Sequence, residues 1–151
     1  IGFKCPFIVY SDVNEESTFD ATIAAMLFTL HILSFTAGSL VFLHRIIYYH
    51  FIWSLVDKLG TLVIGDPLDE VTDMGTIINT KQYTNVCDYI KDCLENKNTE
   101  VICGGLPPKS GHLSEGYYTI PTIFRNTSNE WRLAKEEIFG TVLVAIPWDN
   151  E

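Results

Sequence analysis

Short apolar runs alternate along the chain with longer segments in which apolar residues recur at helical spacing. A short continuous apolar run is typical of a strand that is buried on both faces, whereas helical spacing is typical of a helix with one buried face. The runs predict strands over residues 7–10, 40–43, 101–103, 117–124 and 141–147.

The segments between these strands have helical periodicity. We expect a helix over residues 18–33, a second over residues 46–58 that ends at Gly60, a third capped by Thr80, and a short one over residues 128–135. The apolar face expected for the third helix consists of Tyr83, Val86, Cys87, Ile90, Cys93 and Leu94. Because strands and helices alternate, the chain is predicted to form an α/β domain with a mostly parallel sheet.

The segment over residues 21–43 allows a second interpretation, because about 20 apolar residues can cross a membrane. His31 is its only strongly polar side chain, but Gly38 and Ser39 interrupt the run and the flanks carry no clear excess of Lys or Arg. A buried helix followed by a buried strand, with Gly38 in the connection, has the same hydropathy. We expect that pair and no membrane partner; the alternative is a small membrane protein.

Composition limits the partners of the chain. Its 151 residues fit one domain, and its net charge of −9 disfavours nucleic acid, whose binding needs clustered Lys and Arg. The cysteines lack the spacing of a metal site, so we expect no metal and free buried thiols in a reducing compartment, the cytoplasm. These cysteines are Cys5, Cys87, Cys93 and Cys103.

Several short motifs resemble those of the aldehyde dehydrogenase family, in the family's order and at roughly its spacing. They are residues 4–9 (KCPFIV), 37–39 (AGS), 65–75 (GDPLDEVTDMG), 103–105 (CGG), 116–124 (GYYTIPTIF) and 135–140 (KEEIFG). The resemblance runs nearly from end to end. It implies the α/β catalytic domain of that family, of which residues 1–151 would be a single incomplete domain, either an excerpt or a degraded remnant.

The resemblance also implies an activity, the oxidation of an aldehyde to a carboxylic acid with NAD or NADP. That reaction needs a cysteine thiolate to attack the aldehyde carbon. In the family this cysteine lies two residues before the alanine of the A-G-S motif, and here the position is Phe35, with Ser34 adjacent. Phe35 cannot be a nucleophile, and the sequence shows no base that could activate Ser34. We therefore predict no catalytic residue and no activity for the chain alone.

The residues expected at the cofactor are better preserved. By resemblance, Glu137 matches a glutamate that hydrogen-bonds the nicotinamide ribose, Phe139 an aromatic residue beside the nicotinamide end, and Gln82 a further cofactor-side position. A carboxylate can accept hydrogen bonds from two ribose hydroxyls, and an aromatic face packs against a planar ring. Because the chain has no G-x-G-x-x-G motif for the rest of a dinucleotide, we expect binding of NAD or NADP to be weak.

Other departures from the family pattern favour an alternative function. Phe3 replaces a glycine, Thr141 replaces a proline, and Tyr49, His50 and Trp53 replace usually charged residues. Apolar residues on that helix leave a surface without an obvious cover. The alternative is a non-catalytic remnant that acts at most as a protein-interaction module, through self-association or pairing with aldehyde dehydrogenase subunits.

Overall fold

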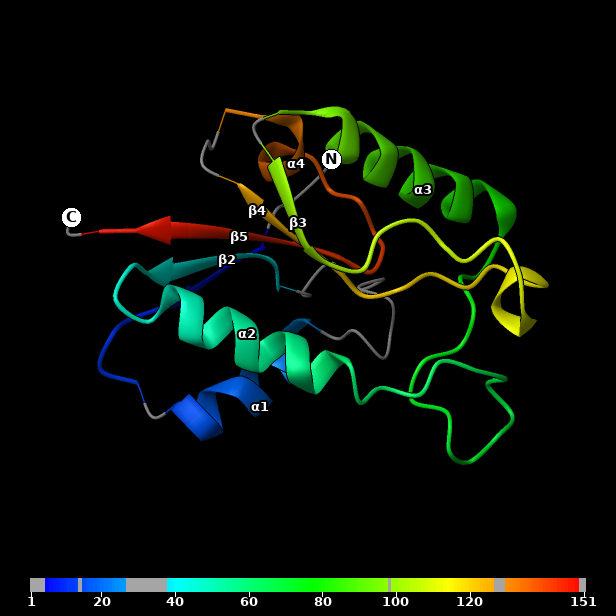
Figure 1. Cartoon of the computed structure of the whole chain (residues 1–151), viewed down its shortest axis with the longest axis horizontal. Helices are drawn as coiled ribbons and strands as arrows, with labels where there is room; N and C mark the ends of the chain where they lie inside the picture. Colours follow the sequence, from blue (N-terminus) through cyan, green and yellow to red (C-terminus); the bar gives the residue numbers. More distant parts are fainter. Residues whose placement is uncertain (1–4, 14, 27–37, 98, 127–129, 150–151) are drawn as a thin grey trace.

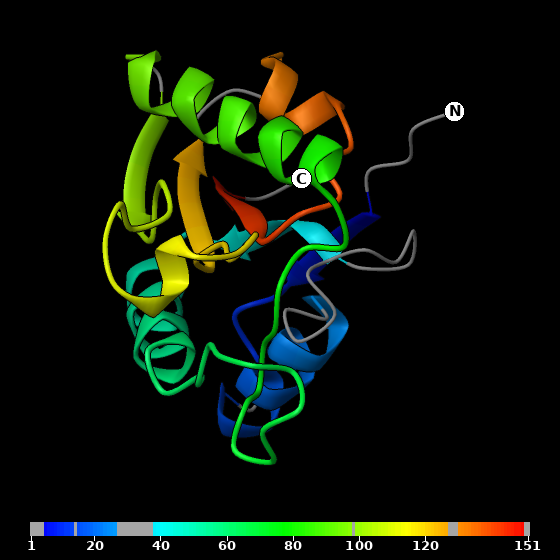
Figure 2. The ribbon, with the colours of Figure 1, turned by 90° about the vertical axis from the view of Figure 1, so that its right-hand side faces the viewer.

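The computed structural model describes residues 5–13, 15–26, 38–97, 99–126 and 130–149. They form three layers, in which one five-stranded sheet lies between two pairs of helices (Figures 1 and 2). The sheet order is β1-β2-β5-β4-β3. The strands are β1 (Cys5–Val9), β2 (Gly38–His44), β3 (Thr99–Cys103), β4 (Thr122–Asn126) and β5 (Val142–Trp148).

The sheet is mostly parallel, as the sequence predicts. β1, β2, β5 and β4 pair with one another in parallel, and only β3 pairs antiparallel, with β4, at the edge. The strand residues point alternately to the two faces, and both faces are covered over the central strands. In β5, Val142 and Val144 pack on the α3 side, whereas Leu143 and Ala145 pack on the α2 side. Burial on both faces explains why these strands read as continuous apolar runs.

Two helices cover each face. Helices α1 (Glu15–Met26) and α2 (Tyr48–Leu59) lie on one face, and α3 (Thr80–Glu95) and α4 (Arg132–Lys135) lie on the other (Figure 2). The expected first helix therefore begins earlier than residue 18, and its expected end at residue 33 lies outside the described residues. Helix α2 ends beside Gly60, as expected, although Gly60 keeps a right-handed helical conformation with φ −64°.

The start of α3 corrects one prediction. The cap is Asn79, whose side chain accepts a hydrogen bond from the Gln82 N–H, and not Thr80. Asn79 is extended, which is the usual cap conformation, while Thr80 already belongs to the helix. The buried face also differs from the predicted one, because Tyr89 is buried and Leu94 is 49% exposed.

Three further boundaries move. Tyr117 to Pro121 is not a strand, and β4 begins only at Thr122, after the proline. Gly38 is the first residue of β2 and not part of a connection before it. Helix α4 begins at Arg132, after Trp131. Within the residues that the structure describes, no helix is long and apolar enough to cross a membrane.

Candidate functional site

The described parts of the segments that carry the family-like motifs meet at one end of the sheet, where the parallel strands begin. Cys5 of β1 pairs with Gly38 of β2, Leu40 of β2 pairs with Val144 of β5, and Val142 pairs with Thr122 of β4. The amino ends of these parallel strands are therefore in line. Residues 136–141 lie at this end of the sheet, just before β5. Ser34 and Phe35 precede β2 in sequence but lie outside the described residues.

Helix α3 fixes the segment over residues 136–141, which we call the cofactor loop. The Gln82 side-chain amide donates hydrogen bonds to the carbonyl oxygens of Ile138 and Phe139, at 2.8 and 2.5 Å. The Asn85 amide donates to the Ile138 carbonyl at 3.3 Å. Ile138 itself is buried. Gln82 thus holds the backbone of the loop, which defines a positioning contact that the sequence did not reveal.

The loop backbone needs a glycine. Phe139 has φ 52°, in the left-handed region that non-glycine residues seldom adopt. A Cβ at the next residue, Gly140, would lie 2.3 Å from the Cγ2 atom of Val86 on α3. The close contact between the loop and α3 therefore depends on the absence of a side chain at Gly140. Phe139 is half-buried.

A polar network anchors the start of the loop. Arg132 donates through Nε to Glu136 at 2.7 Å and through Nη1 to Asp92 at 2.7 Å. The Tyr89 hydroxyl also donates to Glu136, and the Arg132 guanidinium lies 4.2 Å from the centre of the Tyr89 ring. The Arg132 and Tyr89 hydrogen bonds lower the pKa of Glu136 below its usual range. Burial, followed by the bond to Glu136, raises the pKa of Tyr89.

The network should make stability depend on pH. Because the folded-state pKa of Glu136 is lowered, its contribution to the free energy of unfolding is fully present above the ordinary glutamate value of about 4.3. That contribution is lost as pH falls through the lowered folded-state value. Urea unfolding at a series of pH values should show wild type more stable than Glu136→Gln at neutral pH, with the gap closing in acid. A gap that stays constant with pH would contradict this account.

The end of the loop replaces an expected proline by a buried threonine. Thr141 is fully buried, and its hydroxyl contacts the Thr119 hydroxyl at 3.0 Å and donates to the Ile120 carbonyl at 3.2 Å. The Thr141 carbonyl accepts from the Thr122 N–H at 2.8 Å. Since the hydroxyl is satisfied inside the protein, this departure is accommodated by the structure.

The candidate cofactor residues lie together, with different roles open to them. Glu137 and Phe139 are half-buried on the cofactor loop. Gln82 faces the same loop, but its amide is engaged by the loop carbonyls. Sequence reasoning missed Asn85, Tyr89 and the Arg132 network. Helical spacing from Gln82 was a signal for Asn85 and Tyr89, but it could not point to Arg132, which lies on α4.

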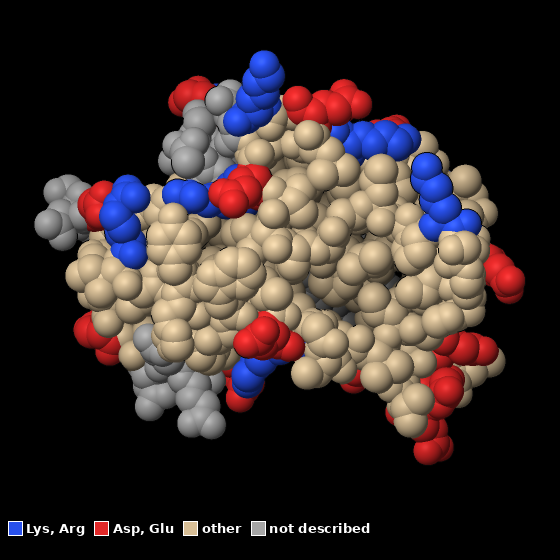
Figure 3. Space-filling view, in the orientation of Figure 1, with Lys and Arg blue, Asp and Glu red and all other residues tan. Residues whose placement is uncertain are grey.

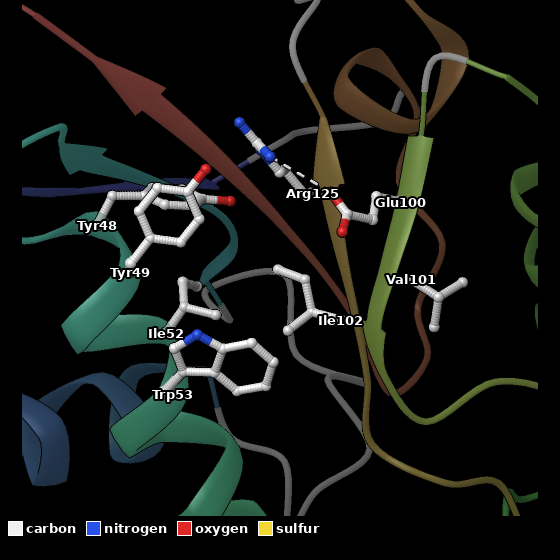
Figure 4. Close-up of a pocket in the computed structure, with 8 residues that line it drawn as sticks. All are labelled: Tyr48, Tyr49, Ile52, Trp53, Glu100, Val101, Ile102 and Arg125. Atoms are coloured by element: carbon white, nitrogen blue, oxygen red, sulfur yellow. Dashed lines mark hydrogen bonds and ion pairs between the residues drawn. The ribbon is translucent and has the colours of Figure 1, made fainter.

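A second concave feature lies on the opposite face of the sheet. It is a groove between α2 and the edge strand β3 (Figure 4), with a volume of about 80 Å³. The Arg125 guanidinium lies 5.8 Å from the Tyr48 ring centre and 5.6 Å from that of Tyr49, and it donates to Glu100 at 3.3 Å. Tyr49 and Trp53 are more than half exposed, as the sequence predicts for this helix.

The thiols and charged groups of the described residues form no metal site. Cys87 and Cys93 are buried, none of the four cysteines forms a disulfide, and no cluster that could hold a metal occurs among the described residues. Burial raises the pKa of Cys103 and of Cys87. Figure 3 shows acidic side chains gathered over the connection between α2 and α3, with basic side chains spread along the opposite border of this face.

Comparisons with known proteins cover the whole chain. The sequence profile of the aldehyde dehydrogenase family matches residues 1–151. Betaine aldehyde dehydrogenase from Brucella anthropi is 32% identical over 100% of this chain and 31% of that protein. HpcC from Thermus thermophilus has a TM-score of 0.89 at 31% identity, over 98% of this chain and 29% of that one. An NAD+ complex of aldehyde dehydrogenase from Bacillus cereus has a TM-score of 0.89 at 30% identity, over 99% and 29%. The chain thus spans less than a third of these proteins.

Proposed function

The chain belongs to the aldehyde dehydrogenase family, and from that premise we propose that it keeps the family's contact with the nicotinamide end of NAD or NADP but not its aldehyde oxidation. The observation that carries the proposal is the cofactor loop, which α3 holds through Gln82 and Val86. In the intact family the reaction converts an aldehyde into a carboxylic acid.

The cofactor loop has the donor and acceptor chemistry that the nicotinamide ribose requires. The Glu137 carboxylate is half-exposed and can accept from ribose hydroxyls, and the Phe139 ring is half-exposed beside it. Phe139 has a left-handed backbone, and the Gln82 amide holds the carbonyl oxygens of Ile138 and Phe139 in place. When bound, the nicotinamide would accept hydride. The Bacillus cereus relative in complex with NAD+ supports the choice of nucleotide.

The reactive thiol is what the chain lacks. The residue at the family's nucleophile position is Phe35, which has no group that could attack an aldehyde, and Ser34 would need an activating base. Three of the described cysteines are unsuited to replace it, because Cys87 and Cys93 are buried and burial raises the pKa of Cys103. Cys5 belongs to β1 and not to the segment just before the A-G-S motif. We therefore assign no catalytic residue to the chain.

Nucleotide affinity tests the proposal. Because only the nicotinamide end has a partner, calorimetry should give a Kd for NAD in about the millimolar range or weaker. Glu137→Ala should weaken binding further, whereas Glu70→Ala, an exposed glutamate on the α2–α3 connection, should leave it unchanged. Micromolar binding that survives Glu137→Ala would place the nucleotide elsewhere.

A second candidate function, protein interaction, follows from the surface of α2. Tyr49 is 56% and Trp53 is 57% exposed, and both flank the groove in Figure 4. Exposed aromatic residues of this kind favour association in water, and the free side of β3 is a further point of pairing. We propose self-association or pairing with another family subunit, in the cytoplasm and without nucleic acid.

Light scattering in detergent-free buffer checks this second candidate. The chain should be larger than a monomer, and Tyr49→Lys with Trp53→Glu should shift it towards the monomer without loss of circular dichroism. A compact wild-type monomer with cooperative melting would exclude self-association.

A further inference from the structure

A cavity of about 260 Å³ lies at the same end of the sheet as the cofactor loop, but on the face that α2 covers. On one side it is lined by the end of α2 and the following segment, with Leu59, Leu62 and Ile64. On the other side it is lined by the end of β3 and the segment before β4, with Cys103, Ile120 and Pro121. Every side chain that the described residues contribute to the lining is therefore aliphatic, a proline ring or a thiol.

The chemistry of the lining selects the ligand. The cavity exceeds the volume of about 150 Å³ at which an engineered apolar cavity takes up benzene. Among the described residues, no charged and no aromatic side chain lines it, whereas quaternary ammonium groups are bound by aromatic cages. An uncharged hydrocarbon chain is the complement of such a surface, because it leaves no polar group without a partner.

The cavity wall is also fixed to the cofactor loop. Ile120, which lines the cavity, accepts a hydrogen bond from the Thr141 hydroxyl at 3.2 Å. Pro121 is followed by Thr122, whose N–H donates to the Thr141 carbonyl at 2.8 Å. Gly104 completes the wall in a left-handed conformation, with φ +79°. Hydrogen bonds therefore tie the cavity wall to the end of the cofactor loop.

We propose that this cavity binds the unbranched hydrocarbon chain of a medium-length aliphatic ligand, such as a fatty alcohol, aldehyde or acid. The inference goes beyond the proposed function, since binding here needs neither a nucleophile nor a nucleotide. The apolar lining also disfavours a cationic ligand at this site, such as betaine aldehyde, the substrate in the name of the Brucella anthropi relative. Leu62, Ile120 and Cys103 are the residues that would contact the hydrocarbon chain.

Protection of Cys103 is the direct test, with 1-octanol as the probe and choline as the charged control. Alkylation of each cysteine is followed by mass spectrometry, with Cys5 as the internal reference. At an octanol concentration about ten times its Kd, mass action leaves about a tenth of the cavities empty, so Cys103 alkylation should slow about tenfold. Choline should have no effect, and Cys5 should react at an unchanged rate.

Filling the cavity provides the matched control. Leu62→Trp should abolish the octanol protection, whereas Val63→Trp should not, because the neighbouring Val63 is 45% exposed and does not line the cavity. Ile64→Phe serves the same purpose if Leu62→Trp does not fold by circular dichroism. The proposal is overturned if octanol gives no protection, if protection survives both filling variants, or if choline protects equally. NAD binding, measured separately, decides the proposed function and not this one.

Discussion

The purified chain is expected to form no NADH when it is given NAD and short- or medium-chain aldehydes. The nucleophile position is Phe35, and loss of the nucleophile alone costs about a millionfold in a serine protease. No cysteine lies between Cys5 and Cys87, the stretch that contains the A-G-S motif, and burial raises the pKa of Cys103. Absorbance at 340 nm against a heat-killed control measures the effect.

Two variants make this expectation sharper. Ser34→Ala should change nothing, because Ser34 has no identified base. Phe35→Cys returns the thiol and shows whether the remaining residues can use it. Turnover by the wild-type chain that Ser34→Ala abolishes would refute the assignment and make Ser34 the nucleophile.

The second large effect is expected at Gly140. In Gly140→Ala the new Cβ would lie 2.3 Å from Cγ2 and 3.2 Å from Cβ of Val86, which is branched and packed in the core. Overpacking of this kind costs about 1–3 kcal/mol, and here it would also push the cofactor loop away from α3. Urea unfolding should therefore show a clear loss of stability, together with weaker NAD binding.

Gly60→Ala is the matched control for this variant. Gly60 has φ −64°, and an added Cβ would meet only the Asp57 and Val56 carbonyl oxygens at 3.3 and 3.4 Å. Alanine suits this backbone, so stability should be kept or rise by about 0.4–1 kcal/mol. The double variant Gly140→Ala with Val86→Ala should lose less stability than the sum of the two single variants, because the smaller side chain relieves the clash. Equal stability of Gly140→Ala and wild type would show that the loop is not held as described.

The sequence predicted the buried strands well, for a physical reason. β2 and β5 are covered on both faces, so their apolar runs carried a strong signal at residues 40–43 and 141–147. Errors occurred where two local signals competed. Asn79 and Thr80 are both good capping residues, and only the hydrogen bond to Gln82 distinguishes them. Tyr89 was missed because its ring is buried while its hydroxyl donates a hydrogen bond to Glu136.

The candidate site was predicted less completely than the fold. Motif resemblance selected Glu137, Phe139 and Gln82, and the structure brings Gln82 to the loop that carries the other two. It could not reveal that Gln82 serves the loop backbone, because the contact joins residues 56 and 57 positions apart. Nor could local patterns reveal the cavity beside Cys103, which needs the end of α2 to lie beside the end of β3 and the segment before β4.

The most direct test of the central claim is an NMR titration of the isotope-labelled chain with NAD. If the cofactor loop binds the nicotinamide end, the backbone amide signals of Glu137, Ile138 and Phe139 should shift together with the side-chain amide of Gln82. The shifts should fit one weak Kd and fade in Glu137→Ala. Signals that shift only at residues far from this loop would contradict the claim.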